Sequence, residues 1–286
     1  LLGGSTYFVD GNGNITKLEH ESGIKAFWDA FIPTSGDGEV TETTYKNVAG
    51  DMLGSYGGRI DYENDTWEMG LYIDHFFEDH SQFTMMSNYG YGVGDKMNER
   101  KGNHYFSYKF KDMMLGLDFK LKAKSWIDAV TFEYIYTKYQ SGPLYHDHTI
   151  TIPDNICGND NYYNHHLQNG WQHWGQVIGN PLYLSPIYND DGVIEVKNNR
   201  FVAYHLGFSG HPIRNLGYKV LATYQDGMGT YNKPYDGYKN SFNLLLEATY
   251  QFPKYWIVTG SFGLDRGDIH GNNAGFQLSV KKYIYK

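Results

Sequence analysis

The residues best suited to chemistry gather in one stretch of the chain, between positions 145 and 176. Tyr-His-Asp-His stands at 145–148, Asn-Asp-Asn-Tyr-Tyr-Asn at 159–164, and Gly-Trp-Gln-His-Trp-Gly at 170–175. An aromatic ring can stack on the apolar C–H face of a sugar, while amides, carboxylates and imidazoles bond its hydroxyl groups. These residue types also let a long loop pack on itself, so composition alone leaves both interpretations open. The candidate sugar-contacting residues are Tyr145, His146, His148, Asn161, Tyr162, Tyr163, Trp171 and Trp174.

Two other constellations could suggest a metal or a catalytic centre. His146 and His148 would point to the same side of an extended strand and could chelate an ion, but their spacing matches no zinc signature. Glu-Asp-His-Ser at 78–81 contains an acid, a base and a hydroxyl, yet adjacent residues of a strand do not face one another. No GxSxG, HExxH or phosphate-binding loop occurs. The sequence predicts no metal, no cofactor and no enzyme activity.

The elements that must position the loop are predicted by an alternation of apolar and polar residues, which is typical of strands. The chain has 27 Tyr and 34 Gly among 286 residues, an excess that favours a β protein over a helical one. The alternating segments span 67–73, 113–121, 130–136, 202–208, 218–224, 242–250, 256–264 and 274–280. Weaker alternation near 1–9, 24–32, 51–63 and 104–111 raises the expected number to roughly eleven or twelve strands.

The length and the links of these strands favour a membrane barrel over a soluble sandwich. Strands of about 9–12 residues match a tilted crossing of a bilayer, whereas globular strands average ~5–6 residues. Tyr and Trp recur at strand ends, as in the aromatic belts of membrane proteins. Short links alternate with long ones, and one connection, at about 140–200, is far longer than the rest. We therefore predict an all-β, antiparallel transmembrane outer-membrane β-barrel whose apolar face contacts lipid.

Bulk composition excludes several other classes. No apolar run approaches the ~18 residues that a transmembrane helix needs. The single Cys, Cys157, excludes a disulfide scaffold and a cysteine zinc site. The formal net charge of −8 argues against nucleic acid as a partner, since nucleic-acid binding requires a basic face.

Several strings, in order along the chain, resemble the capsule assembly Wzi family in the form found in Bacteroides-like bacteria. The resemblance extends from about residue 20 to the end and is most specific over 72–81 and 132–210. The strings lie at 25–33, 72–81, 132–148, 160–164, 170–175, 178–182 and 198–201.

This resemblance implies an eighteen-stranded outer-membrane barrel lectin with a periplasmic helical plug, which holds capsular or surface polysaccharide at the surface of a Gram-negative cell. It implies no residue-level glycan site, so the candidates above come from the loop composition alone. Family members are longer, so residues 1–286 are expected to form a single β-barrel domain that lacks the N-terminal part of the barrel and the plug. The implied partners are the polysaccharide, outer-membrane lipid and other capsule export components.

Two rival functions remain open from the sequence. A porin-like channel for a solute or an oligosaccharide would use the long loop as a constriction. An outer-membrane barrel hydrolase would place Asp79 or His80 in a catalytic site.

Overall fold

The structure, a computed structural model, describes the chain in segments that divide into two compact units. The described residues are 5–19, 22–24, 27–28, 54–77, 86–91, 95, 100–104, 111–140, 142, 158–159, 161, 163–164, 172–253 and 255–284. Unit 1 comprises 1–54, 77–107 and 141–158, and unit 2 comprises 55–76, 108–140 and 159–286. Unit 1 contains two hairpins, one of β1 (Ser5–Val9) with β2 (Ile15–Glu19) and one of β5 (Met86–Tyr91) with β6 (Arg100–His104).

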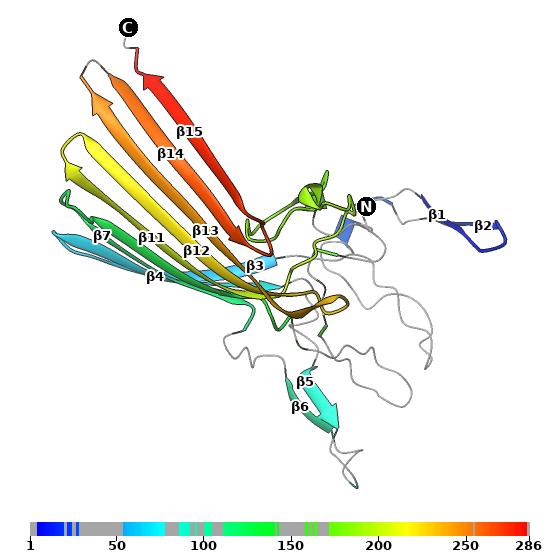
Figure 1. Cartoon of the computed structure of the whole chain (residues 1–286). Coiled ribbons are helices and arrows are strands. Elements are labelled where there is room, and N and C mark those ends of the chain that lie inside the picture. The colour runs from blue at the N-terminus through cyan, green and yellow to red at the C-terminus, as the bar shows by residue number, and fades with distance from the viewer. Residues whose placement is uncertain are drawn as a thin grey trace. The chain divides into compact units, whose positions relative to one another are not determined.

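Unit 2 is built on one antiparallel sheet of nine strands (Figure 1). The strands neighbour one another in chain order, so the sheet is a meander interrupted by two long excursions, at 78–112 and 137–200. The strands are β3 (Gly54–Glu63), β4 (Trp67–Phe77), β7 (Met113–Leu121), β8 (Ala129–Tyr136), β11 (Phe201–Ile213), β12 (Leu216–Gly229), β13 (Pro234–Phe252), β14 (Trp256–Gly267) and β15 (Asn273–Lys282).

The predicted all-β class and the eight strongly alternating segments are confirmed, because each segment lies in one strand of this sheet. The expected eleven or twelve barrel strands are not found among the described residues. The segment near 1–9 provides β1, which pairs with β2 in a separate hairpin, and most of 104–111 lies outside the described residues. The sheet is not closed in the described chain, since β3 and β15 are its two edges.

Alternation along the strands and matched registers between them give the sheet two different faces. On β13, Leu246 pairs with Phe262 of β14, whereas its neighbour Glu247 pairs with Ser261. Apolar residues therefore line up in rows on one side and polar residues on the other. The apolar side chains are widely accessible: the exposed fraction is 44% for Leu206, 40% for Leu246 and 73% for Phe276.

The polar face is organised by long side chains that lie flat across glycines. Arg59 of β3 crosses Gly70 of β4 and reaches Asp118 of β7, with 2.7 Å between Nη1 and Oδ2. In the same way Tyr72 crosses Gly116 and donates a 2.6 Å hydrogen bond to Glu133. A Cβ at either glycine would stand about 2.1 Å from the crossing side chain.

The two ends of the sheet differ in their connections. One end, which we call the short-turn end, holds the links β3–β4, β7–β8, β11–β12 and β13–β14 (Figure 1). The opposite end, the long-loop end, holds both excursions together with the links β12–β13 and β14–β15. The meander topology thus brings both long excursions to one end.

The crossing of Tyr72 over Gly116 predicts a stability effect. The substitution Gly116→Val should displace the Tyr72 ring, break its bond to Glu133 and lower the free energy of unfolding by about 1–3 kcal/mol. The matched control is Gly263→Val, on the same face, where a Cβ meets nothing within 4 Å. Urea unfolding followed by tryptophan fluorescence measures both variants, and equal midpoints would contradict the crossing.

Candidate functional site

The candidate sugar-contacting residues fall partly within the described chain. Tyr145, His146, His148, Tyr162 and Trp171 lie outside the described residues, so their assignment stays a prediction. The other three, Asn161, Tyr163 and Trp174, belong to the excursion between β8 and β11 in unit 2.

Trp174 is held out into solvent at the tip of a small hairpin. Strands β9 (Gln172–His173) and β10 (Gln176–Val177) pair, and Trp174 and Gly175 form the two-residue turn between them. Their φ values are 52° and 74°, as a type I′ turn requires, and this conformation is strained for an aromatic residue. The indole is 87% exposed. The turn is braced by Ile187 of the 3-10 helix η3 (Pro186–Tyr188), whose N–H donates to the carbonyl of Gly175 at 3.0 Å.

Tyr163 serves the packing of the loop in this structure. Its side chain is 3% exposed, and its ring centroid lies 4.3 Å from that of Tyr183. Tyr183 in turn packs edge-on against Phe201, the first residue of β11, at 5.2 Å. This aromatic row fixes the loop to the sheet, so Tyr163 offers no open ring face to a ligand here.

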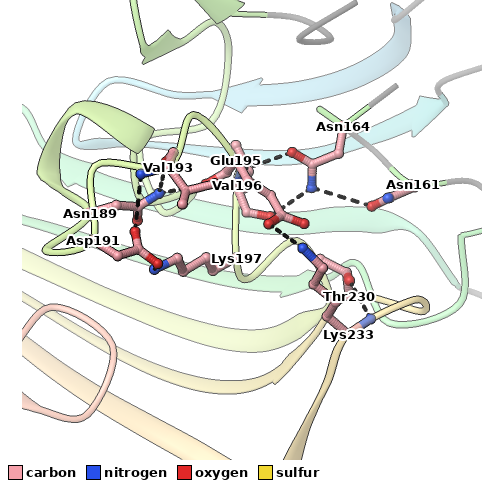
Figure 2. Close-up of polar contacts among 10 residues, drawn as sticks. All are labelled: Asn161, Asn164, Asn189, Asp191, Val193, Glu195, Val196, Lys197, Thr230 and Lys233. Carbon is pink, nitrogen blue, oxygen red and sulfur yellow. Dashed lines mark hydrogen bonds and ion pairs between the residues drawn. The ribbon is translucent and has the colours of Figure 1, made fainter. Parts of the chain in front are cut away.

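Asn161 and Asn164 fasten the loop through their amides (Figure 2). The Asn164 side chain donates to the Val196 carbonyl at 2.7 Å and accepts from the Val196 N–H at 2.8 Å. Asn161 Oδ1 accepts hydrogen bonds from the amides of Asn199, at 2.8 Å, and of Asn164, at 3.4 Å. Two parts of the excursion that lie more than thirty residues apart in sequence are thereby joined.

Two ion pairs lie near these amide contacts. Lys197 lies 2.7 Å from Asp191, and this hydrogen bond holds the pKa of the Asp191 carboxyl below its usual value. Lys233 of the β12–β13 link bonds Glu195 at 2.7 Å (Figure 2). These pairs are at least partly exposed, so each one adds little to stability.

Beneath the loop lies a cluster of buried polar residues that the sequence analysis missed. The carbonyl of Asn199 accepts from Thr137 at 2.8 Å and from Gln140 at 2.9 Å. Gln225 of β12 donates to the Leu182 carbonyl at 3.4 Å. The string Asn-Asn-Arg-Phe at 198–201 was a signal for this cluster, but only the fold shows that its amides point inward.

A cation–π pair lies next to this cluster, at the β12–β13 link. The Arg200 guanidinium lies 3.7 Å above the centroid of the Tyr231 ring, and the Tyr231 hydroxyl donates to the Tyr139 carbonyl at 2.6 Å. Burial raises the pKa of Tyr231 to about 12, so this hydroxyl stays a hydrogen-bond donor at neutral pH.

The described residues of this region include an exposed aromatic rim. Trp174 and Tyr188, the latter 69% exposed, stand over a loop that fixed amides and ion pairs hold in place. No group of three or more metal-ligating side chains occurs within the described segments. Ser241 and His270 are 2.9 Å apart, but Ser241 is fully buried and cannot meet a substrate.

Comparison with known proteins finds no match for this chain. No protein-family model, curated protein or solved structure matches the chain. Among the described residues, no helix is both long and apolar enough to span a membrane.

The two hydrogen bonds between the Asn164 side chain and the Val196 backbone predict how the loop responds when the amide is removed. Asn164→Ala should leave the Val196 backbone groups unpaired and ease opening of the segment 161–200 by about 1–3 kcal/mol. Limited proteolysis of that segment measures the change, and cleavage should be about tenfold faster or more. Asn232→Ala, an exposed amide of the β12–β13 link, is the control and should leave the rate unchanged.

Proposed function

We propose that the nine-stranded sheet forms part of the wall of an outer-membrane β-barrel, and that its long-loop end binds surface polysaccharide without changing it chemically. The observation that carries the proposal is the pair of opposite faces of one wide sheet. An apolar face that stays 40% exposed or more at many positions is costly in water, whereas hydrocarbon accommodates it.

The distribution of aromatic residues on the apolar face supports a membrane setting. Tyr62, Trp67 and Trp256 stand at the short-turn end, and Tyr134 and Tyr204 stand towards the long-loop end. Between these two rows lie aliphatic residues and Phe. Amphipathic rings are enriched at both membrane–water interfaces, and outer-membrane barrels carry such girdles.

The opposite face suits a wet barrel interior. Lys120–Glu68 and Lys219–Glu247 pair across neighbouring strands, and Arg59 pairs with Asp118 across the intervening strand β4. In a barrel the interior faces water or a plug, so these charges need no burial in lipid. Short turns at one end and long loops at the other match periplasmic turns and extracellular loops.

Polysaccharide binding is supported by the long-loop end and by the resemblance to the capsule assembly Wzi family. Trp174 keeps a strained backbone and an almost fully exposed ring, and such outliers cluster at functional sites. An exposed indole beside amide-rich loop segments provides stacking and hydroxyl recognition together.

A porin-like channel is a second candidate, favoured by the flat-lying side chains. Arg59 and Tyr72 follow the sheet across Gly70 and Gly116 rather than projecting away from it, so they would narrow a lumen little. A steady ion current in planar bilayers would favour the channel, and its absence together with polysaccharide retention would favour the lectin.

The wall proposal predicts different outcomes for two adjacent leucines of β13. Leu246→Arg places a charge on the apolar face and should disfavour membrane insertion by about 2–4 kcal/mol near the midplane. Leu245→Arg places the same charge on the polar face and should insert much like the wild type. Insertion is measured by membrane fractionation and by heat-modifiable migration on gels.

Three results would count against the proposal that the sheet is part of a membrane barrel wall. The proposal is wrong if the unaltered chain remains soluble without detergent, if the two variants insert equally well, or if Leu245→Arg is the more damaging one.

The polysaccharide proposal predicts the effect of removing the loop indoles. Trp171→Ala combined with Trp174→Ala should release surface polysaccharide into the medium while the barrel still inserts. Trp126→Ala is the matched control, since Trp126 lies in the β7–β8 link at the short-turn end and is also exposed, by 72%. Unchanged retention in the double variant would overturn the assignment of the site.

A further inference from the structure

A depression lies in the apolar face of the sheet over strands β12 to β15. Its volume is about 410 Å³, within the range of ~300–1,000 Å³ typical of small-molecule sites. Ala248 and Gly260, which pair across β13 and β14, form its floor because their side chains are the smallest in these rows. Tyr218, Phe262 and Phe276 form its rim.

The absence of a side chain at Gly260 keeps this space open, although the neighbouring residues would accommodate a Cβ there. A Cβ at position 260 would meet Phe276 at 3.9 Å, which is ordinary van der Waals contact. A larger side chain is therefore tolerated by the fold but would grow into the depression.

A cation stands in line with the depression at the short-turn end. Gly260 pairs with Leu278, Val258 with Val280, and Trp256 with Lys282. The apolar row therefore leads along β14 and β15 to Lys282, about 13 Å from Leu278 at ~3.3 Å per residue. The Lys282 ammonium lies 4.9 Å above the centroid of the Trp256 ring.

We propose that this row is a binding site for one anionic glycerophospholipid, with an acyl chain in the depression over Gly260 and the phosphate at Lys282. The inference rests on the proposed function, since the apolar face must lie in a membrane. An indole at headgroup level beside an ammonium is suited to a phosphate, and the depression beyond it has a mainly apolar lining that suits an acyl chain.

The positive charge of Lys282 favours an anionic phospholipid over the other occupants that an apolar depression could hold. The same row of a second copy would bring no described acidic residue to pair with Lys282. A lipid without phosphate would leave Lys282 unused.

Native mass spectrometry of the purified chain with phosphatidylglycerol as the probe tests the site. We expect one lipid to be retained, with affinity reduced on the order of tenfold in Gly260→Leu, because the side chain fills the depression. Lys282→Gln should weaken binding about fivefold. Diacylglycerol with the same acyl chains should bind as weakly to the wild type as phosphatidylglycerol does to Lys282→Gln.

The controls lie on the opposite face of the same strands. Gly263→Leu on β14 and Lys281→Gln on β15 should bind phosphatidylglycerol like the wild type. Equal retention by Gly260→Leu and the wild type would overturn the site, as would a wild type that dimerises through this face and loses only its dimer in Gly260→Leu. If the chain inserts but retains no phosphatidylglycerol, only this inference fails; if the chain does not insert, the proposed function fails with it.

Discussion

An apolar sheet face must be removed from water, and the rest of the structure follows from that constraint. Nine antiparallel strands pair in chain order, and apart from irregularities at Gly210–Ile213 and Gly227–Gly229 their registers set apolar residues beside apolar residues. The opposite face has to satisfy every charge that alternation places there. Glycines at 70 and 116 let side chains reach the next strand but one and complete those pairs. The same arrangement that exposes one face thus organises the other.

The meander also separates the tasks of the two ends. Tight turns at the short-turn end hold neighbouring strands in register, while the long-loop end carries the excursions and the exposed Trp174. The described part of this loop is held in place by side-chain amides, several of them buried. Asn164, Asn199 and Gln225 tie it to itself and to the sheet.

The sequence predicted the strands well and the loop poorly, for different physical reasons. Alternation is a local pattern, so segments such as 242–250 and 256–264 could be placed from their own residues alone. The crossing of Tyr72 over Gly116 depends on register between strands, which no single segment encodes. Within the loop, the exposure of Trp174 and the burial of Tyr163 depend on which aromatic ring meets Tyr183. An aromatic residue carries the same signal in both roles.

The unequal connections also imply an order of assembly. Strands β11 to β15 are joined only by tight links, so their pairing closes short loops. Pairing β8 with β11 closes the connection 137–200, which costs about 2 kcal/mol more chain entropy at ~0.6 kcal/mol per doubling of length. The links within β11 to β15, like the β3–β4 link, therefore close at a lower entropic cost, which favours pairing within these blocks before β8 joins β11. Tyr183 and the Leu182 carbonyl of the segment 137–200 dock on Phe201 and Gln225, which belong to the block β11 to β15.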